Sequence, residues 1–263
     1  MRFIAGNSYK CALNVAKKQL LLGKKPIINY IKEDINNHKN TYNEYIHLLN
    51  YIDHNYSIAI KLSSFNFNEH VINTLIEKYK KHNVKIFIDA ERSDQNKKYQ
   101  EISNKLILNH NDNYNIIKTY QMYRKDSYYQ LKHDIDLYNK NKVKIGIKMV
   151  RGAYWNSEHK NGELFINKKD TDNNYNNAIK YINNLEGYKV LATHNDNSIN
   201  IACSMKSDFK FAHLLDMKTC KYNSVSKNND VFIYIPYGPY NSMIPYLFRR
   251  LYENIDTVKY MMT

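Results

Sequence analysis

Glycine, proline and cysteine are scarce in this sequence, with 7, 4 and 3 occurrences among 263 residues. The cysteines, Cys11, Cys203 and Cys220, are too few and too scattered for a disulfide framework or a zinc cluster, which favours a reducing compartment. No Gly-x-Gly-x-x-Gly, Gly-x-x-x-x-Gly-Lys or Gly-x-Ser-x-Gly pattern occurs. We therefore expect neither a Rossmann-bound nucleotide nor the nucleophile elbow of an α/β-hydrolase.

Long apolar runs are absent too, because no segment reaches the roughly 20 residues that a membrane-spanning helix needs. The opening residues MRFIAGNSYK lack the hydrophobic core of a signal peptide, and they are not rich in arginine and serine as transit peptides are. With the low cysteine content, this predicts an intracellular location, either cytoplasmic or peripherally associated with a membrane.

Acidic residues are fewer than basic ones: the chain has 25 Asp and Glu and 39 Lys and Arg, which gives a net charge of +14. The lysines are spread along every segment, whereas a nucleic-acid-binding chain usually gathers them in one arm or stripe. The joint abundance of Asn, Ile, Lys and Tyr is typical of a nucleotide-biased genome. We therefore predict no nucleic-acid binding, only a mild attraction for anionic ligands.

Short β-rich apolar runs alternate with segments of helical periodicity. The expected strands are residues 26–31, 56–62, 84–90, 115–121, 142–150, 188–194, 209–215 and 231–236. The expected helices are residues 7–23, 68–82, 94–109, 127–141 and 172–187, the last closed by Gly187. Eight strand–helix repeats in about 250 residues favour a (β/α)8 barrel over a doubly wound open sheet. Since no Gly/Pro/Ser-rich linker interrupts the pattern, we predict one domain over residues 1–263.

Catalytic residues of such barrels lie where strands end, and the expected strand ends carry cations, acids, amides and an imidazole. These residues are Lys61, Asp89, Glu91, Gln121, Lys148, Arg151, His194, Asn195 and Tyr234. Lys61 is either a cation of the barrel rim or part of a pocket. Asp89 and Glu91 suit a metal, an acid–base pair, or a salt bridge that orients the lysine.

Two further segments have both a functional and a structural interpretation. In KMVRGAYWNSE (148–158), Gly152 and Ala153 allow close approach to a flat ligand, but the same residues suit a tight turn. In ATHNDNS (192–198), His194 and Asn195 suit hydrogen bonding to a heteroaromatic cofactor or the capping of a helix. A metal site is not expected there, because partner histidines at suitable spacing are missing.

The segment YIPYGPYNSMIPYLFRRLYEN (234–254) places Arg249 and Arg250 side by side, with Tyr246 and Glu253 one turn away on either side. Paired guanidinium groups bind a carboxylate through charge-assisted hydrogen bonds. Together with RFIAGNSYKCAL, IKLS, IDAE, YQMY, KMVRGAYW and ATHN, in this order, the segment resembles the proline dehydrogenase (proline oxidase) family, and the resemblance covers nearly the whole chain.

The resemblance implies a monofunctional enzyme with a distorted (β/α)8 barrel, an extra N-terminal helix and a final helix, called helix 8, over the pocket. It implies FAD-dependent oxidation of L-proline to Δ1-pyrroline-5-carboxylate, the first step of proline catabolism, by hydride transfer to flavin N5. Because the amine would react in its neutral form, activity is expected to rise toward alkaline pH. The acceptor would be a quinone or another electron acceptor, and a separate pyrroline-5-carboxylate dehydrogenase would act next.

The resemblance also implies roles for individual residues. A carboxylate clamp would consist of Lys61, Arg249 and Arg250, with Asp89 orienting Lys61 and Glu253 pairing with an arginine. The wall around the proline ring would consist of Tyr154, Leu214, Tyr234 and Tyr246. FAD would be held by Gln121, Lys148, Val150, Gly152, Ala153, Trp155, His194 and Asn195, and no metal is implied.

The chain departs from the family pattern at the seventh strand, where Leu-Leu-Asp-Met stands in place of the common Leu-x-Gly-Met and puts Asp216 at the glycine position. An acid there would weaken binding of a carboxylate or point away from the pocket. Two alternatives to L-proline oxidation stay open. One is a dehydrogenase of hydroxyproline or another cyclic imino acid, and the other is a flavin-binding homologue without turnover.

Overall fold

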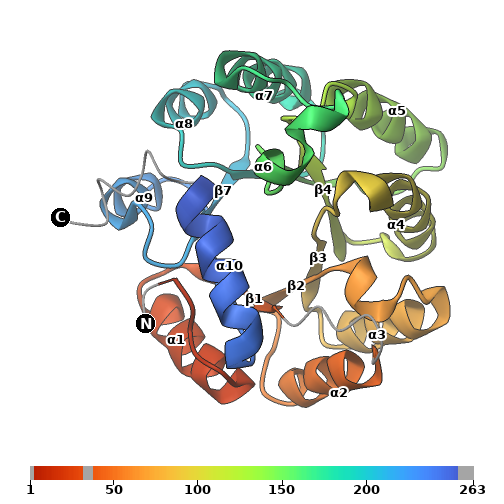
Figure 1. Ribbon diagram of the computed structural model, residues 1–263, viewed down its shortest axis with the longest axis vertical. Coiled ribbons are helices and arrows are strands. Elements are labelled where there is room, and N and C mark those ends of the chain that lie inside the picture. The colour runs from red at the N-terminus through yellow and green to blue at the C-terminus, as the bar shows by residue number, and fades with distance from the viewer. Residues whose placement is uncertain (1–2, 32–37, 254–263) are drawn as a thin grey trace. The chain divides into compact units, whose positions relative to one another are not determined.

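Eight parallel strands form a closed barrel in the order β1-β2-β3-β4-β5-β6-β7-β8 in the computed structural model. The structure describes residues 3–31 and 38–253, with only the backbone for residues 248–253. Helices follow the strands along the chain, as Figure 1 shows. The predicted (β/α)8 barrel is confirmed.

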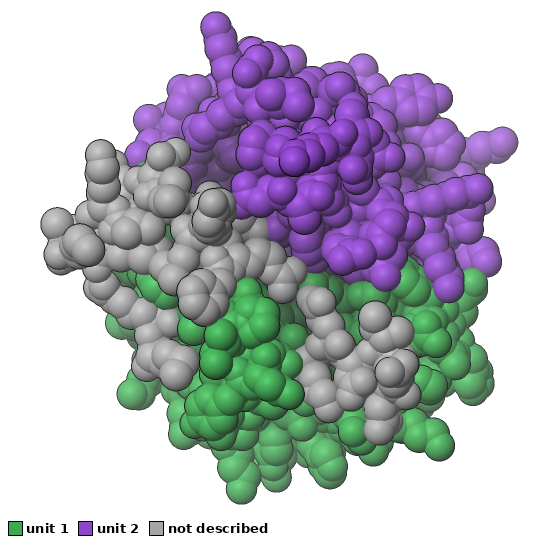
Figure 2. Space-filling model, viewed as in Figure 1, with its two compact units in different colours: residues 1–87, 212–263 green, residues 88–211 purple. Residues whose placement is uncertain are grey.

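The chain forms two compact units, coloured differently in Figure 2. Unit 1 contains residues 1–87 and 212–263, and unit 2 contains residues 88–211. The unit boundaries fall inside β3 (Lys85–Ile88) and β7 (Phe209–Leu214). The prediction of a single domain stays a prediction.

Unit 1 begins with the extra N-terminal helix that the sequence predicts. Its first segment contains α1 (Tyr9–Leu21), β1 (Lys25–Tyr30), α2 (His38–Leu49), β2 (Ser57–Ile60), the 3-10 helix η1 (Leu62–Phe65) and α3 (Glu69–Lys81). Its second segment contains α9 (Thr219–Val225), β8 (Val231–Tyr237) and α10 (Tyr240–Glu253). β8 pairs with β1 from Lys25↔Phe232 to Tyr30↔Tyr237 and so joins the two segments.

Helix α3 illustrates how these helices form. Asn68 caps its N-terminus by accepting a hydrogen bond from the Val71 N–H. The buried residues lie three or four positions apart on one face of the helix, namely Ile72, Leu75, Ile76 and Tyr79. The predicted range 68–82 differs from the observed helix by one residue at each end.

Helix α10 is held by an apolar cluster in unit 1. Met243 and Tyr246, only 1% and 8% exposed, pack with Ile4 and with Ile31, the residue after β1. Figure 1 shows α10 crossing the end of β1. The structure confirms a final helix after β8, held by side chains of a single face, whereas its predicted place over the substrate pocket stays a prediction.

Unit 2 continues the strand–helix alternation through three strands. It contains η2 (Ser93–Gln95), α4 (Asn96–His110), β4 (Ile116–Gln121), α5 (Ser127–Lys140), β5 (Gly146–Val150), α6 (Trp155–Glu158), η3 (His159–Asn161), α7 (Lys168–Ile182), β6 (Tyr188–Ala192) and α8 (Asp196–Cys203). Within this unit, β5 pairs in parallel with β4 and with β6.

Two predicted boundaries in unit 2 were wrong for local physical reasons. β5 starts at Gly146 and not at residue 142. The Asn111 side-chain amide donates a hydrogen bond to the Lys144 carbonyl at 2.7 Å, so this carbonyl is already bound before the sheet begins. A Cβ at Gly146 would lie 2.3 Å from the Ile116 oxygen, so only glycine allows the strands to approach. The predicted helix 172–187 ends at Ile182, and Gly187 packs against the Ile145 carbonyl.

A buried ion pair stabilises the layer between α4, β4 and α5. Lys118 Nζ lies 2.7 Å from Asp134 Oδ2 and 2.5 Å from Asn104 Oδ1, and both charged side chains are fully buried. Burial lowers the pKa of Lys118 to about 8, although the Asp134 carboxylate opposes this shift. Burial alone would raise the pKa of Asp134, but the charge of Lys118 and the hydrogen bonds outweigh it and lower the pKa. This pair belongs to the core of unit 2.

No helix among the described residues combines the length and the apolar character that crossing a bilayer requires.

Candidate active site

Lys148 and Asp89 form an ion pair in unit 2. Lys148 lies inside β5 and Asp89 follows the end of β3, and their Nζ and Oδ1 atoms are 2.7 Å apart. The two side chains are only 6% and 13% exposed, so the contact is largely shielded from solvent. The sequence predicted both residues for the site but did not predict that they pair with each other.

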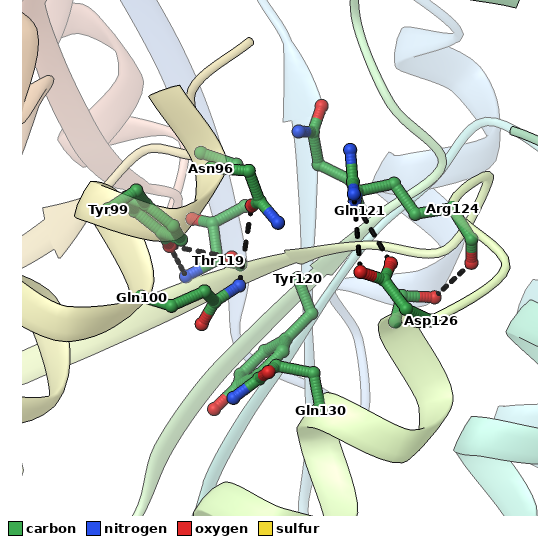
Figure 3. Close-up of a pocket in the computed structure, with 11 residues that line it drawn as sticks. Asn96, Tyr99, Gln100, Thr119, Tyr120, Gln121, Arg124, Asp126 and Gln130 are labelled. Carbon is green, nitrogen blue, oxygen red and sulfur yellow. Dashed lines mark hydrogen bonds and ion pairs between the residues drawn. The ribbon is translucent and has the colours of Figure 1, made fainter. Parts of the chain in front are cut away.

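Gln121 ends β4 and is fixed by the backbone that follows β3. Its Nε2 donates to the Glu91 carbonyl at 2.8 Å. Gln121 also lines a small pocket over β4, drawn in Figure 3. Two buried polar atoms in this pocket, Thr119 Oγ1 and Gln100 Oε1, have no hydrogen-bond partner among the described residues. With a volume of about 10 Å³, the pocket has room for one water molecule and not for an amino acid.

The end of β6 supplies a helix cap. Asn195 Oδ1 accepts from the Ser198 N–H at 3.0 Å and caps α8, which confirms the capping interpretation. His194 lies next to it, two residues after the last residue of β6. The cofactor role of both residues stays a prediction, and it must coexist with the cap of Asn195.

Arg151, directly after β5, is bound by side chains of unit 2. Its Nε lies 2.7 Å from Asp172 Oδ1, its Nη1 contacts Thr193 Oγ1, and its Nη2 donates to Ser198 Oγ at 2.9 Å. The guanidinium group also covers the ring of Tyr175, at 4.5 Å from the centroid. Arg151 therefore ties β5, α7, β6 and α8 together.

The Gly152–Trp155 segment makes internal contacts. Gly152 has a positive φ of 143°, and a Cβ there would lie 2.4 Å from the Tyr123 ring, so the close approach seen is to this ring. Trp155 Nε1 donates to the Phe165 carbonyl at 3.0 Å, and its indole stacks on His159 at 4.3 Å. Val150 accepts from the Met122 N–H at 2.8 Å. A cofactor contact of this segment stays a prediction.

The sequence did not identify a hydrogen-bond network that joins the loops after β3, β4 and β5. Glu158 accepts from the Ser93 N–H and Oγ, both at 2.9 Å, and from the Tyr123 hydroxyl at 3.3 Å. Arg124 Nη1 donates to Ser93 Oγ at 2.8 Å and lies 3.2 Å from Glu163. Burial and the Glu158 charge raise the pKa of Tyr123, which keeps this phenol protonated. The available signal was that Ser93, Tyr123 and Arg124 lie within five residues of the end of a strand, whereas nothing in the sequence marked the more distant Glu158 and Glu163.

Unit 1 contains three other described site residues, two at the ends of β2 and β7 and one inside β8. Lys61 follows β2 directly, with extended backbone, and is half-buried. Leu214 is the last residue of β7. Tyr234 was predicted to end the eighth strand, but β8 continues to Tyr237 because these residues keep pairing with β1.

Three predicted residues lie outside the described side chains. Arg249, Arg250 and Glu253 are part of the α10 backbone, whereas nothing is described of their side chains. Tyr246, one turn before Arg249, is buried in the apolar cluster with Met243. The roles of these four predicted site residues in substrate binding stay predictions.

The described polar groups suit a flat heteroaromatic cofactor better than a metal. Lys148 offers a cation anchored by Asp89, and Gln121 offers an amide anchored by the Glu91 carbonyl. Such fixed charges and hydrogen-bonding groups are what a protein supplies to a flavin. No group of three or more His, Cys, Asp or Glu side chains among the described residues could hold a metal ion.

Comparison with known proteins identifies the family. A family model described as proline dehydrogenase matches residues 17–262. The mitochondrial proline dehydrogenase 1 of Dictyostelium discoideum is 30% identical over 201 residues, covering 65% of this chain and 34% of the relative. The hydroxyproline dehydrogenase of Xenopus laevis is 27% identical over 231 residues, covering 74% of this chain and 49% of the relative.

The solved structures agree at the level of the fold. Proline utilization A (PutA) from Bdellovibrio bacteriovorus, inactivated by N-propargylglycine, matches with a TM-score of 0.89 and 19% identity, over 96% of this chain and 32% of that chain. The chain thus spans about a third of that protein, and between a third and a half of the curated relatives it matches first. The match of the family model over nearly the whole sequence shows that the chain belongs to the proline dehydrogenase family.

Proposed function

We propose that this chain catalyses the FAD-dependent oxidation of L-proline to Δ1-pyrroline-5-carboxylate. The observation that carries the proposal is the family match over residues 17–262, which spans both the KMVRGAYW segment and the arginine pair of α10. Because the chain spans only part of the length of its relatives, its activity as a separate enzyme is itself part of the proposal.

The residues of the chain would bind and orient the substrate. Lys61, Arg249 and Arg250 would hold the proline carboxylate, since guanidinium and ammonium groups form charge-assisted hydrogen bonds with it. Tyr154, Leu214, Tyr234 and Tyr246 would restrict the pyrrolidine ring, which contributes by removing orientational freedom before reaction. Glu253 would fix an arginine from one turn away on α10.

A second set of residues would hold the cofactor. Lys148, Gln121, His194 and Asn195 would supply polar contacts, and Val150, Gly152, Ala153 and Trp155 would supply the surrounding surface. When bound, FAD would supply the acceptor for the hydride that leaves the substrate carbon next to nitrogen. The ion pair with Asp89 supports this assignment of Lys148, because it holds the ammonium group in one place before the cofactor binds.

Hydroxyproline is the second candidate substrate, supported by the similarity to the Xenopus laevis hydroxyproline dehydrogenase. A flavin-binding homologue without turnover is the third possibility. If the chain is an enzyme, we propose a quinone as electron acceptor, reached through peripheral contact with a membrane. A separate pyrroline-5-carboxylate dehydrogenase would carry out the next step. The positive net charge of +14 supports contact with an anionic membrane surface.

One anaerobic titration tests these candidates. The purified protein should show the absorption bands of an oxidised flavin, and adding L-proline should bleach them. The rate of bleaching should rise from neutral to mildly alkaline pH, because only the neutral amine can donate a hydride. Bleaching by hydroxyproline alone would select the second candidate, and flavin that neither compound bleaches would select the third. A protein that binds no flavin, even after incubation with FAD, would overturn all three.

A further inference from the structure

Unit 1 contains a second pocket, on the side of β8 that α1 and α9 cover. Its volume is about 290 Å³, near the lower end of the range of small-molecule sites, which start at about 300 Å³. In Figure 1, α9 and α1 follow one another around the ring of helices, with α9 above α1 on the left. The pocket is large enough for an amino acid and too small for a dinucleotide, and no residue proposed for proline or FAD binding lines it.

Lys24 is the buried cation of this pocket. It precedes β1, and only 2% of its surface is exposed. Five lysines are buried among the described residues, namely Lys24, Lys118, Lys148, Lys189 and Lys210. Each of the other four makes a side-chain contact, with Asp134, Asp89, Ser207 and Asp208 respectively. The Lys24 ammonium has no hydrogen bond or ion pair of this kind within the described part of the chain.

Lys189 shows how the fold normally satisfies a lysine at such a position. Like Lys24, it lies at the start of a strand and is buried, with 4% of its surface exposed. Its Nζ lies 2.9 Å from the Leu185 carbonyl, 3.1 Å from the Asn183 carbonyl and 2.6 Å from Ser207 Oγ. Lys24 Nζ is not one of the fully buried side-chain atoms that lack a hydrogen-bond partner among the described residues, so it is open to the pocket that Lys24 lines. In contrast to the Lys189 ammonium, which is held by three groups of the protein, the Lys24 ammonium is therefore accessible to a ligand in this pocket.

The pocket also contains an acceptor that lacks a donor. Gln19 Oε1, on α1, is buried without a hydrogen-bond partner in the part of the chain that the structure describes. Asp216 lines the same pocket and is exposed, and its charge acts on Lys24. Burial lowers the pKa of Lys24, and the Asp216 charge counteracts this only in part. The site therefore offers one buried cation together with two groups that attract a cation.

The remaining lining fits a small ligand with a short apolar part. Thr219, Asn223 and Ser226 follow one another at helical spacing along the face of α9 that lines the pocket. Leu22 and Ile233 supply apolar surface. We propose that this pocket is a binding site for a small zwitterion, such as a free α-amino acid, whose carboxylate contacts Lys24 and whose ammonium group contacts Gln19 Oε1 and Asp216.

Three small probes separate the contributions of the two charges. L-Alanine carries both, propionate lacks the ammonium group, and ethylamine lacks the carboxylate. Ligand-observed NMR titrations of the full chain should show that L-alanine binds, with propionate and ethylamine at least tenfold weaker. If propionate bound as tightly as L-alanine, the proposal that the ligand is a zwitterion would be wrong. If L-alanine did not bind, the proposal of a binding site would be wrong.

Two variants locate the binding. Lys24→Met should weaken L-alanine binding at least tenfold, and Asp216→Asn should weaken it about threefold. Lys189→Met is the matched control, because it removes another buried lysine of the same chain and should leave the affinity unchanged. If L-alanine bound to Lys24→Met as tightly as to the native chain, its binding site would lie elsewhere, and the proposal would be wrong.

Thermal unfolding without ligand provides a second, independent test. Lys24→Met should unfold at the same temperature as the native chain or higher, since it removes an ammonium group that lacks a partner. Lys189→Met should lower the unfolding temperature by about 4 °C or more, because it leaves carbonyl groups without their donor. A drop of the same size in Lys24→Met would mean that Lys24 already has its partner inside the protein, and this would also overturn the proposal.

Discussion

At the residue scale, the loop between β7 and α9 contains two non-glycine residues with left-handed backbone. Asp216 has φ 60° and Lys218 has φ 47°. The family pattern has glycine at position 216, and the left-handed conformation explains why, since glycine adopts it without cost. Asp is among the few other residues that tolerate this region, so the substitution keeps the loop conformation. The structure further places Asp216 at the pocket with Lys24 and Gln19.

Lys218 gives a stability prediction because lysine has no special tolerance for this backbone. Lys218→Gly should raise the free energy of unfolding by about 0.5–1 kcal/mol, since it relieves a left-handed conformation that costs an ordinary residue roughly 1–2 kcal/mol, less the added freedom of the unfolded chain. Urea denaturation measures the change.

The matched control lies three residues away. Lys221 is inside α9, where glycine costs about 1 kcal/mol, so Lys221→Gly should lower the free energy of unfolding. If both glycine variants changed the free energy of unfolding in the same direction, backbone conformation would not decide the effect of glycine at these positions.

Individual site residues could be named from the sequence, but their contacts could not. Asp89 and Lys148 were both predicted, one as the partner of Lys61 and the other as a ligand of FAD. Their ion pair depends on the depth at which each side chain enters the barrel, and this depends on strand register across 59 residues of sequence. Asn195 was left open between cap and ligand; the structure shows the cap of α8, and the ligand role stays a prediction.

At the element scale, the sequence predicted strands and long helices better than short helices. Strands such as β2, with the sequence SIAI, are short apolar runs rich in β-branched residues, which are visible without any tertiary information. Helix α2 was missed because Thr41 and Tyr45, two of its four buried residues, have polar groups that hide the apolar spacing. Helices α8 and α9 have only 8 and 7 residues, too few to show a helical period.

Helix α10 gives a prediction at this scale, because Met243 and Tyr246 anchor it through one small cluster. Met243→Ala should cost about 2–5 kcal/mol in packing and release the helix before the barrel unfolds. Hydrogen exchange of the α10 amides should become faster while β4 and β5 keep their protection. If the arginines of α10 bind proline as proposed, KM should rise more than kcat falls.

The control for this prediction is the neighbouring residue on the same helix. Ile244 is 57% exposed, so Ile244→Ala should leave both the exchange rates and KM close to those of the native chain. If Met243→Ala behaved like Ile244→Ala, the cluster would not hold the helix.

At the scale of the whole molecule, the (β/α)8 barrel was predictable because the chain repeats one pattern eight times. The two compact units were not, because the boundaries at Phe87 and Phe211 fall inside strands and carry no linker composition. Sequence signals for domains come from exposed connections, and here the chain passes from one unit to the other within β3 and β7.

The stability of the whole chain toward acid should depend on Asp172, which connects Arg151 with the start of α7. Asp172 lies 2.7 Å from Arg151 Nε and 3.1 Å from Lys168 Nζ. Burial alone would raise the pKa of Asp172, but the hydrogen bonds and charges of the two cations outweigh it and lower the pKa below 3.8. The folded state therefore binds the proton of this carboxyl group less tightly than the unfolded state does.

The sign of this shift defines where the stabilisation acts. It is fully present above the pKa of the unfolded chain, about 4, and it is lost as the pH falls through the lower pKa of the folded chain. Asp172→Asn should therefore reduce the free energy of unfolding by about 1–2 kcal/mol at pH 7, with the difference from the native chain shrinking below pH 4. Urea titrations between pH 3 and 7 measure it, with Asp170→Asn as an exposed control from the same helix turn. A difference that stays constant down to pH 3 would show that Asp172 acts through packing and not through its charge.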